Sequence, residues 1–273
     1  MSENIPTREE WRRLYAAAQR VKELAPWEWM EEVDVFGVQD PDTGEWGFLS
    51  VMGLLGEHYA VSVYRGTEAL HAFWDWHEEG SEEDTPQRLF ETPQLQASFE
   101  DRDLLNKEDR QIIKELGLKF RGRNTWPLFR SYRPGLFPLF VEASEARLLA
   151  CALEQLPEVA LRFREDPDLL YPDEEDTCLV RVPQRRTGAL TWEDRLLPLP
   201  PPQPMRIDFA MNTWMLEGLK RQKPGDRTLE IDLFIYLSPV KEKGDERPYF
   251  PYMLMVVDAE NGMILGSDLL PPL

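Results

Sequence analysis

The first part of the chain changes from a helical to an alternating spacing of apolar residues. From Trp11 to Leu24 the apolar positions recur every three or four residues, and Thr7 with Glu10 forms a capping-box pattern just before them. Three segments rich in Val, Phe, Tyr and Trp follow, separated by turn residues, over residues 33–39, 46–52 and 59–64. The sequence therefore predicts an amphipathic helix followed by an antiparallel meander.

Helical and strand patterns are interspersed over the next hundred residues. A second helix is predicted over residues 67–79, a strand over 96–101, and a longer helix over 142–156. Asn106 is a preferred N-cap residue and Gly117 a preferred residue after a helix end, so a short helix is expected between them. Long alternating βα units do not occur, which favours an α+β fold with antiparallel sheets and packed helices over a doubly wound one.

An acidic segment divides the pattern. Residues 165–176, EDPDLLYPDEED, combine prolines with seven carboxylates and have no apolar period, which is typical of a solvated connection. The sequence thus predicts two domains: an N-terminal domain over 1–165, an acidic linker over 166–176, and a smaller C-terminal domain over 177–273. In the last of these we expect a helix over 209–221, strands over 229–237 and 252–258, and a hairpin at Asn261-Gly262.

The charge of the chain limits its partners. Lys and Arg number 31 against 50 Asp and Glu, a formal net charge of -19, which repels nucleic-acid phosphates and anionic lipid surfaces. Nucleic acid and membranes are therefore not expected as partners, although such acidity also fits a basic protein partner or DNA mimicry. No signal peptide or membrane-length apolar stretch occurs, so a cytoplasmic location is expected. Cys151 and Cys178 have no paired spacing and are expected to be buried free thiols.

Familiar catalytic and cofactor motifs are missing from the sequence. Neither a glycine-rich phosphate loop nor a Gly-x-Ser-x-Gly elbow occurs, so no cofactor and no catalytic residue is predicted. With three histidines in the chain, a histidine-rich metal site is not expected either. His71, Asp75 and Glu78 share one helical face and have the chemistry of metal ligands, but a solvated polar face opposite an aromatic stripe is the simpler interpretation.

One segment is basic in an otherwise acidic chain. Residues 114–135, KELGLKFRGRNTWPLFRSYRPG, carry six cations against one acid, interleaved with aromatic residues. Because the guanidinium fork matches carboxylate and phosphate groups and aromatic rings provide a stacking wall, the segment predicts an anion-binding site. The candidate residues are Arg121, Arg123, Arg130, Arg133, Trp126 and Tyr132. The competing interpretation is that these arginines pair with the protein's own carboxylates.

Three stretches resemble segments of a known group of proteins. They are WGFLSVMGLLGEHYAVSVYRG, WPLFRSYRPGLFP and PYMLMVVDAENGMILG, and they are similar to parts of uncharacterised bacterial proteins built from two adjacent domains of unknown function. The resemblance extends from about Trp27 to the end of the chain. It implies a bacterial cytoplasmic origin and brings no activity, cofactor or catalytic residue with it.

Two functions are compatible with these observations. The first is a non-catalytic binding protein of the bacterial cytoplasm that recognises an anionic group, on a protein or a small molecule, through the Arg/aromatic segment. The alternative is a hydrolase acting on an anionic small molecule, in which arginines hold the substrate and carboxylates supply acid/base chemistry. The decisive observation is whether the guanidinium groups converge on an open cavity or are each neutralised by an internal acid.

Overall fold

The chain folds into two compact units. The computed structural model describes residues 4–78, 90, 92–174, 176–186, 189–202, 217–218, 220–221, 225, 227–241 and 247–272. One unit comprises residues 1–134 and 138–202, and the other comprises 135–137 and 203–273. None of the helices in these described ranges has both the length and the apolar character needed to cross a bilayer.

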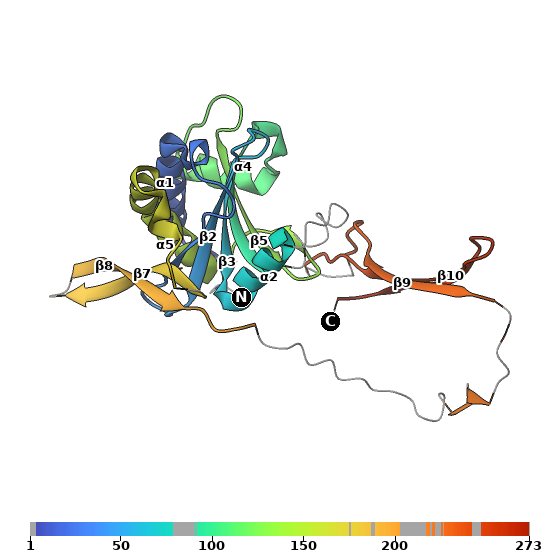
Figure 1. Cartoon of the computed structure of the whole chain (residues 1–273). Helices are drawn as coiled ribbons and strands as arrows, with labels where there is room; N and C mark the ends of the chain where they lie inside the picture. Colours follow the sequence, from blue (N-terminus) through green and yellow to red (C-terminus); the bar gives the residue numbers. More distant parts are fainter. Residues whose placement is uncertain are drawn as a thin grey trace. The chain divides into compact units, whose positions relative to one another are not determined.

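An eight-stranded sheet forms the centre of the first unit (Figure 1). Its strand order is β6-β5-β4-β3-β2-β1-β7-β8. The strands are β1 (Phe36–Gln39), β2 (Trp46–Met52), β3 (Ala60–Arg65), β4 (Gln94–Glu100), β5 (Trp126–Arg133), β6 (Leu136–Leu139), β7 (Thr177–Arg186) and β8 (Ala189–Pro198). The consecutive strands β1 to β5 pair antiparallel, as do β7 and β8, whereas β1 and β7 pair parallel. The predicted antiparallel meander is confirmed as β1–β3.

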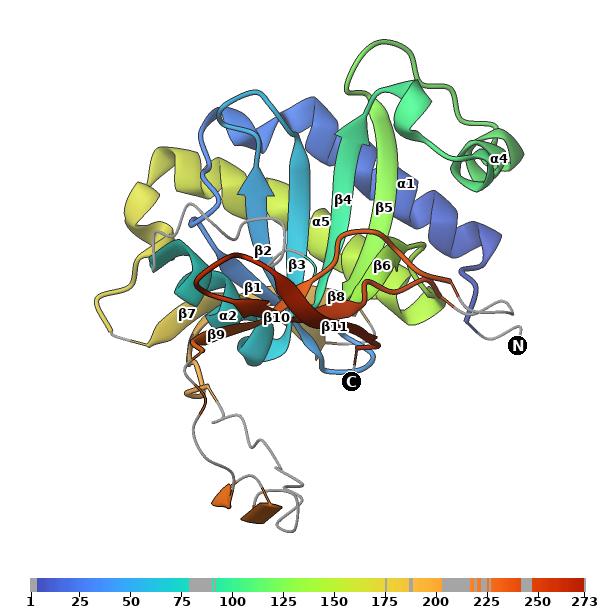
Figure 2. The same cartoon turned by 90° about the vertical axis from the view of Figure 1, so that its right-hand side faces the viewer.

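Helices cover both faces of this sheet (Figure 2). The helical elements are α1 (Arg8–Leu24), η1 (Pro26–Glu28), α2 (Gly66–Glu78), η2 (Arg102–Leu104), α4 (Lys107–Leu116), α5 (Ala143–Glu165) and η3 (Pro167–Leu170). The larger core cluster, with Leu14, Leu49 and Leu153 fully buried, lies where α1 and α5 pack on one face. A smaller cluster around Phe48 and Phe73 lies under α2 on the other face.

Local sequence signals set the ends of α1 and α4. The Thr7 hydroxyl accepts a hydrogen bond from the Glu10 amide at 3.2 Å, so the predicted capping box begins α1. Asn106 caps α4 in the same way, and the helix ends at Gly117, whose φ of 74° is a left-handed conformation that glycine adopts at little cost. Both helices are confirmed, and the second of them forms part of the site described below.

Helix α5 is longer than its sequence pattern predicted. The pattern predicted a helix that ends at about Leu156, yet α5 continues through Pro157 to Glu165. A proline inside a helix removes a backbone hydrogen bond, and the burial of Val159 and Phe163 in the main core offsets that loss.

The boundary between the units does not lie in the acidic segment. Residues 167–170 form η3, whose Leu170 is buried in the core, and residues 177–198 form β7 and β8 of the large sheet. The boundary lies after Pro202 instead. Strand β7 joins the sheet by pairing with β1, whose residues precede it by about 140 positions, and no local sequence pattern reports such a pairing.

The second unit contains a three-stranded antiparallel sheet with the order β11-β10-β9. Its strands are β9 (Leu229–Ile235), β10 (Tyr252–Asp258) and β11 (Ile264–Leu270). The predicted Asn261-Gly262 turn joins the last two, with Gly262 at a φ of 71°. Most of the helix predicted over 209–221 lies outside the described residues. The α+β fold class is confirmed.

Candidate anion-binding site

Two of the four candidate arginines are paired with buried carboxylates. Arg130 on β5 donates to both carboxylate oxygens of Asp109, at 3.0 and 2.7 Å. Arg133 at the end of the same strand lies 2.6 Å from a carboxylate oxygen of Glu142 and 3.0 Å from one of Glu145. For these two residues the structure shows the competing interpretation, in which the cations hold elements of the protein together.

The other candidate residues lie in different surroundings. Arg123 is 91% exposed and lies 3.5 Å from Asp101. Tyr132 is partly buried and donates to the Gln96 amide oxygen at 3.3 Å, and burial raises the pKa of its hydroxyl. Arg121 is exposed and has no carboxylate within 4.0 Å among the described residues. The six candidates therefore do not converge on one point. Of the four candidate arginines, Arg121 alone has no carboxylate partner among the described residues.

Arg121 and Trp126 line a hollow that we call the basic hollow. Its volume is about 670 Å³, and no Asp or Glu is among the residues that line it. Its lining includes six basic residues, all of them exposed: Arg102, Lys107, Arg110, Lys114, Lys119 and Arg121. In a chain with a net charge of -19, this is a local concentration of positive charge without a carboxylate in its lining.

Helix α4 and the loop after it position these cations. Lys107, Arg110 and Lys114 follow one another at helical spacing, so they lie on one face of α4. The chain then turns at Gly117 and returns Lys119 and Arg121 to the same hollow. Sequence reasoning placed three of the six basic residues in a basic segment but missed Arg102, Lys107 and Arg110. For Lys107 and Arg110, the spacing relative to Lys114 on the predicted helix was the available signal.

Asp109 fixes α4 to the sheet. Its carboxylate accepts from the Asn106 backbone amide at 3.0 Å, completing the capping box, and it also binds Arg130. Asp109 is 5% exposed and the Arg130 side chain 15% exposed, so the pair is well shielded from water. Arg130, predicted as a ligand-binding residue, thus holds in place the helix that carries the cations of the basic hollow.

Aromatic rings form one wall of the basic hollow. The Phe120 and Trp126 ring centroids are 5.7 Å apart in a T-shaped arrangement, and the Arg102 guanidinium lies 5.8 Å from the Trp126 ring centroid. Phe120 also stacks on Tyr15 of α1.

Among the described residues none of the three lysines of the hollow has an ion-pair partner. A bound anion would therefore be attracted by several cations at once and would reduce their mutual repulsion.

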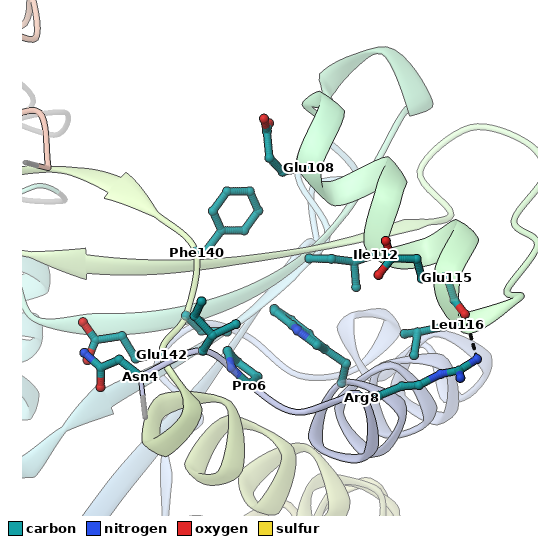
Figure 3. A pocket seen from close by; sticks show the side chains of 12 residues that line it. Asn4, Pro6, Arg8, Glu108, Ile112, Glu115, Leu116, Phe140 and Glu142 are labelled. Carbon is teal, nitrogen blue, oxygen red and sulfur yellow. Dashed lines mark hydrogen bonds between the residues drawn. The ribbon is translucent and has the colours of Figure 1, made fainter. Parts of the chain in front are cut away.

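A second hollow lies on the other side of α4 and has a different character (Figure 3). Its volume is about 600 Å³, and we call it the apolar hollow. It is lined chiefly by Ile5, Pro6, Trp11, Ile112, Leu116, Phe140 and Val141. Arg8 also lines it and donates to the backbone carbonyl oxygen of Glu115 at 2.9 Å.

Other chemistry is limited within the described part of the chain. There, no three His, Cys, Asp or Glu side chains come together in a way that would hold a metal ion. His71, considered above as a ligand, has its Nε2 2.7 Å from the carbonyl oxygen of Pro200. Cys151 and Cys178 are free and buried, as predicted, and burial raises the pKa of each thiol to about 12. Neither thiol is a reactive nucleophile at neutral pH.

The structure defines an α+β protein with a basic hollow beside a short helix at one end of a large mixed sheet. The family model described as "Domain of unknown function (DUF7309)" matches residues 11–181, which include the whole lining of the basic hollow and eight of the twelve residues that line the apolar hollow. A second, "Domain of unknown function (DUF6930)", matches residues 215–273. Because the first match covers more than half of the chain, the protein belongs to the DUF7309 family. Neither the curated proteins nor the solved structures contain a match.

Proposed function

We propose that this protein is a non-catalytic binding protein that recognises an anionic group in the basic hollow. The observation that carries the proposal is the lining of that hollow, with six exposed basic residues and no carboxylate, in a strongly acidic chain. The proposal keeps Arg121 and Trp126 from the sequence prediction and adds the cations of α4. We further propose a bacterial cytoplasmic setting, for which the support is the sequence resemblance.

The ligand group is compact rather than an extended polyanion. The positive charge is confined to one hollow, whereas the chain as a whole carries a charge of -19 and repels long polyanions beyond that hollow. Phosphate and carboxylate groups both match the lysine and arginine donors. The pairing is exposed to solvent, so salt is expected to weaken it.

The test is a calorimetric titration of the full chain with tripolyphosphate and with a triglutamate peptide. It is carried out at low and at physiological salt concentration. The double charge reversal Lys114→Glu/Arg121→Glu removes two cations from the hollow. It is expected to weaken binding at least tenfold.

The matched control is Arg12→Glu/Arg20→Glu, which makes the same change in net charge. Arg12 and Arg20 are exposed on α1 and line neither hollow. The control is expected to change affinity much less. Equal losses in the two double variants would show that overall charge, not the hollow, determines binding. Absence of binding by both probes would contradict the proposal.

The hydrolase alternative has its own test. A panel of phosphatase and esterase substrates is incubated with purified protein, with and without a chelator. Turnover that the chelator abolishes would replace the binding proposal with an enzymatic one. Absence of turnover with every substrate, together with tripolyphosphate binding, supports the non-catalytic function.

A further inference from the structure

We propose that the ligand is a segment of a protein partner, in which an apolar anchor residue is followed or preceded, a few residues away, by a cluster of carboxylates. The anchor occupies the apolar hollow, and the carboxylates occupy the basic hollow on the other side of α4. This inference rests on the proposed function and specifies the partner for the same site.

The apolar hollow has the character of a pocket for a hydrophobic side chain. Trp11 is 8% exposed and Ile112 and Leu116 are half-buried, while Ile5 is 69% exposed. Figure 3 shows Ile112 and Leu116 projecting from α4 on one side of the hollow and Phe140 on another side. A volume of about 600 Å³ is ample for a large side chain and its neighbouring backbone.

Carboxylates make the apolar hollow unsuitable for an anion. Glu108, Glu115 and Glu142 are among its lining residues, and Arg8 is the one basic residue there. The two hollows therefore differ in what they accept, one an apolar group and the other a negatively charged one. Charge complementarity assigns the carboxylates of the partner to the basic hollow and its apolar residue to the other.

Helix α4 separates the two hollows and sets the spacing of the partner's residues. Residues 108, 112, 115 and 116 line the apolar hollow, and residues 107, 110, 111, 113 and 114 line the basic one. A helix with its side chains is about 10 to 12 Å across. An extended chain rises about 3.3 Å per residue, so the first carboxylate lies about four positions from the anchor, with three residues between them.

A peptide fits this arrangement better than a small molecule or a nucleic acid. A compact small molecule fills one hollow but does not cross the helix to the other. A nucleic acid that left the basic hollow would bring phosphates toward Glu108 and Glu115, in a chain that is already strongly negative. A peptide satisfies both hollows because its side chains alternate freely between apolar and acidic.

The experiment uses fluorescein-labelled ten-residue peptides and the full chain. Each peptide has one leucine anchor, a three-residue Ser/Gly spacer, three glutamates and three flanking Ser/Gly residues, and it is made in both orders, with a leucine-to-alanine version of each. In fluorescence anisotropy, at least one order is expected to bind five- to tenfold more tightly than its alanine version. Lys114→Glu/Arg121→Glu weakens both versions.

The substitution Ile5→Gln tests the apolar hollow. Ile5 is exposed, so the variant is expected to keep the wild-type melting temperature. It should remove the advantage of the leucine peptide and leave tripolyphosphate affinity unchanged. Leu190→Gln, on the 45% exposed Leu190 of β8, is the matched control and should have no effect.

The outcomes separate this inference from the proposed function. Equal affinity of the leucine and alanine peptides in both orders, with tripolyphosphate still bound in the basic hollow, overturns the peptide partner and leaves the anion site intact. Tighter binding of a single-stranded oligonucleotide than of any peptide also overturns it. Failure of tripolyphosphate as well as of the peptides removes the proposed function itself.

Discussion

Glu145 is a buried carboxylate that several donors keep ionised. Its side chain is 1% exposed and accepts from the Glu142 amide at 2.8 Å, the Ser131 hydroxyl at 2.9 Å and Arg133 at 3.0 Å. Arg65 lies 3.4 Å away. Burial alone would raise the pKa of this carboxyl, but the hydrogen bonds from Glu142, Arg133 and Ser131 outweigh it and hold the pKa below the ordinary value of 4.5.

The lowered pKa of Glu145 makes its contribution to stability dependent on pH. The contribution is complete above pH 4.5, the ordinary value of the carboxyl, and is lost as the pH falls through the lower pKa of the folded protein. Glu145→Gln should cost about 2 to 3 kcal/mol at pH 7, because a charged acceptor is removed from several donors. Urea unfolding of the variant and the wild type at pH 7 and pH 3.5 measures this loss of unfolding free energy. A difference between variant and wild type that stays constant over this range would contradict the assignment.

Gln94 has a buried amide that makes no side-chain hydrogen bond to any residue that the structure describes. It is fully buried on β4, and neither its amide oxygen nor its amide nitrogen has a hydrogen-bond partner within the described structure. Gln94→Met should therefore raise the free energy of unfolding by about 1 kcal/mol, because an unpaired polar group is replaced by an apolar one of similar size. The matched control is Gln96→Met, since Gln96 accepts from Tyr132 and should lose stability. A lower melting temperature for Gln94→Met would contradict the prediction.

Helix α4 owes its position to one carboxylate. Asp109 caps the helix and binds Arg130 of β5, so Asp109→Asn removes a charge from a shielded pair and leaves Arg130 uncompensated. The expected cost is about 3 kcal/mol in urea unfolding. Considered as electrostatics alone, the loss of a negative charge near the basic hollow would strengthen tripolyphosphate binding, because the anion would be repelled less. We expect weaker binding instead, because the helix that presents Lys107 and Lys114 is less well held.

The control for this prediction is Glu108→Gln, which makes the same charge change on the same helix. Glu108 is exposed and has no ion-pair partner among the described residues, so stability should be unchanged and tripolyphosphate affinity slightly higher. Stronger tripolyphosphate binding by Asp109→Asn would show that α4 keeps its position without that carboxylate.

Elements whose signals lie within a few residues were predictable from the sequence. Thr7 with Glu10 and Asn106 with Gly117 mark helix ends through neighbouring backbone atoms, and strand β2 has the predicted bounds. The roles of the arginines were not predictable in this way. Whether Arg130 binds a ligand or an internal acid depends on which carboxylate the fold brings to β5, and Asp109 is 21 residues away in the sequence.

The residues of the basic hollow were also only partly predictable from a contiguous stretch of sequence. A contiguous count of charge revealed Lys114, Lys119 and Arg121, because they are close in sequence. It missed Arg102, which precedes α4. It also missed Lys107 and Arg110, which reach the basic hollow through the periodicity of α4 and are separated in sequence by acids that point elsewhere. Counting charge by helical face instead of by contiguous segment would have included Lys107 and Arg110.

The fold of the first unit as a whole depends on the pairing of β7 with β1, two strands that are far apart in the sequence. Strand β7 lies beside β1, and it contributes to the cores on both faces of the sheet. Leu179 belongs to the cluster under α1 and α5, whereas Val180 and Val182 belong to the cluster under α2. Each such side chain stabilises the fold by about 1.5 to 3 kcal/mol when fully buried. The unit therefore extends well beyond the acidic segment.

Two truncated chains test where the unit ends. A chain ending after Pro202 keeps β7 and β8 and should melt in one cooperative transition and bind tripolyphosphate as the full chain does. A chain ending at Glu165 exposes the edge of β1 and both core clusters, so it should lack a cooperative transition in near-ultraviolet circular dichroism and should aggregate. If the shorter chain melted like the longer one, β7 would be an accessory strand, and the acidic segment would be the true limit of the unit.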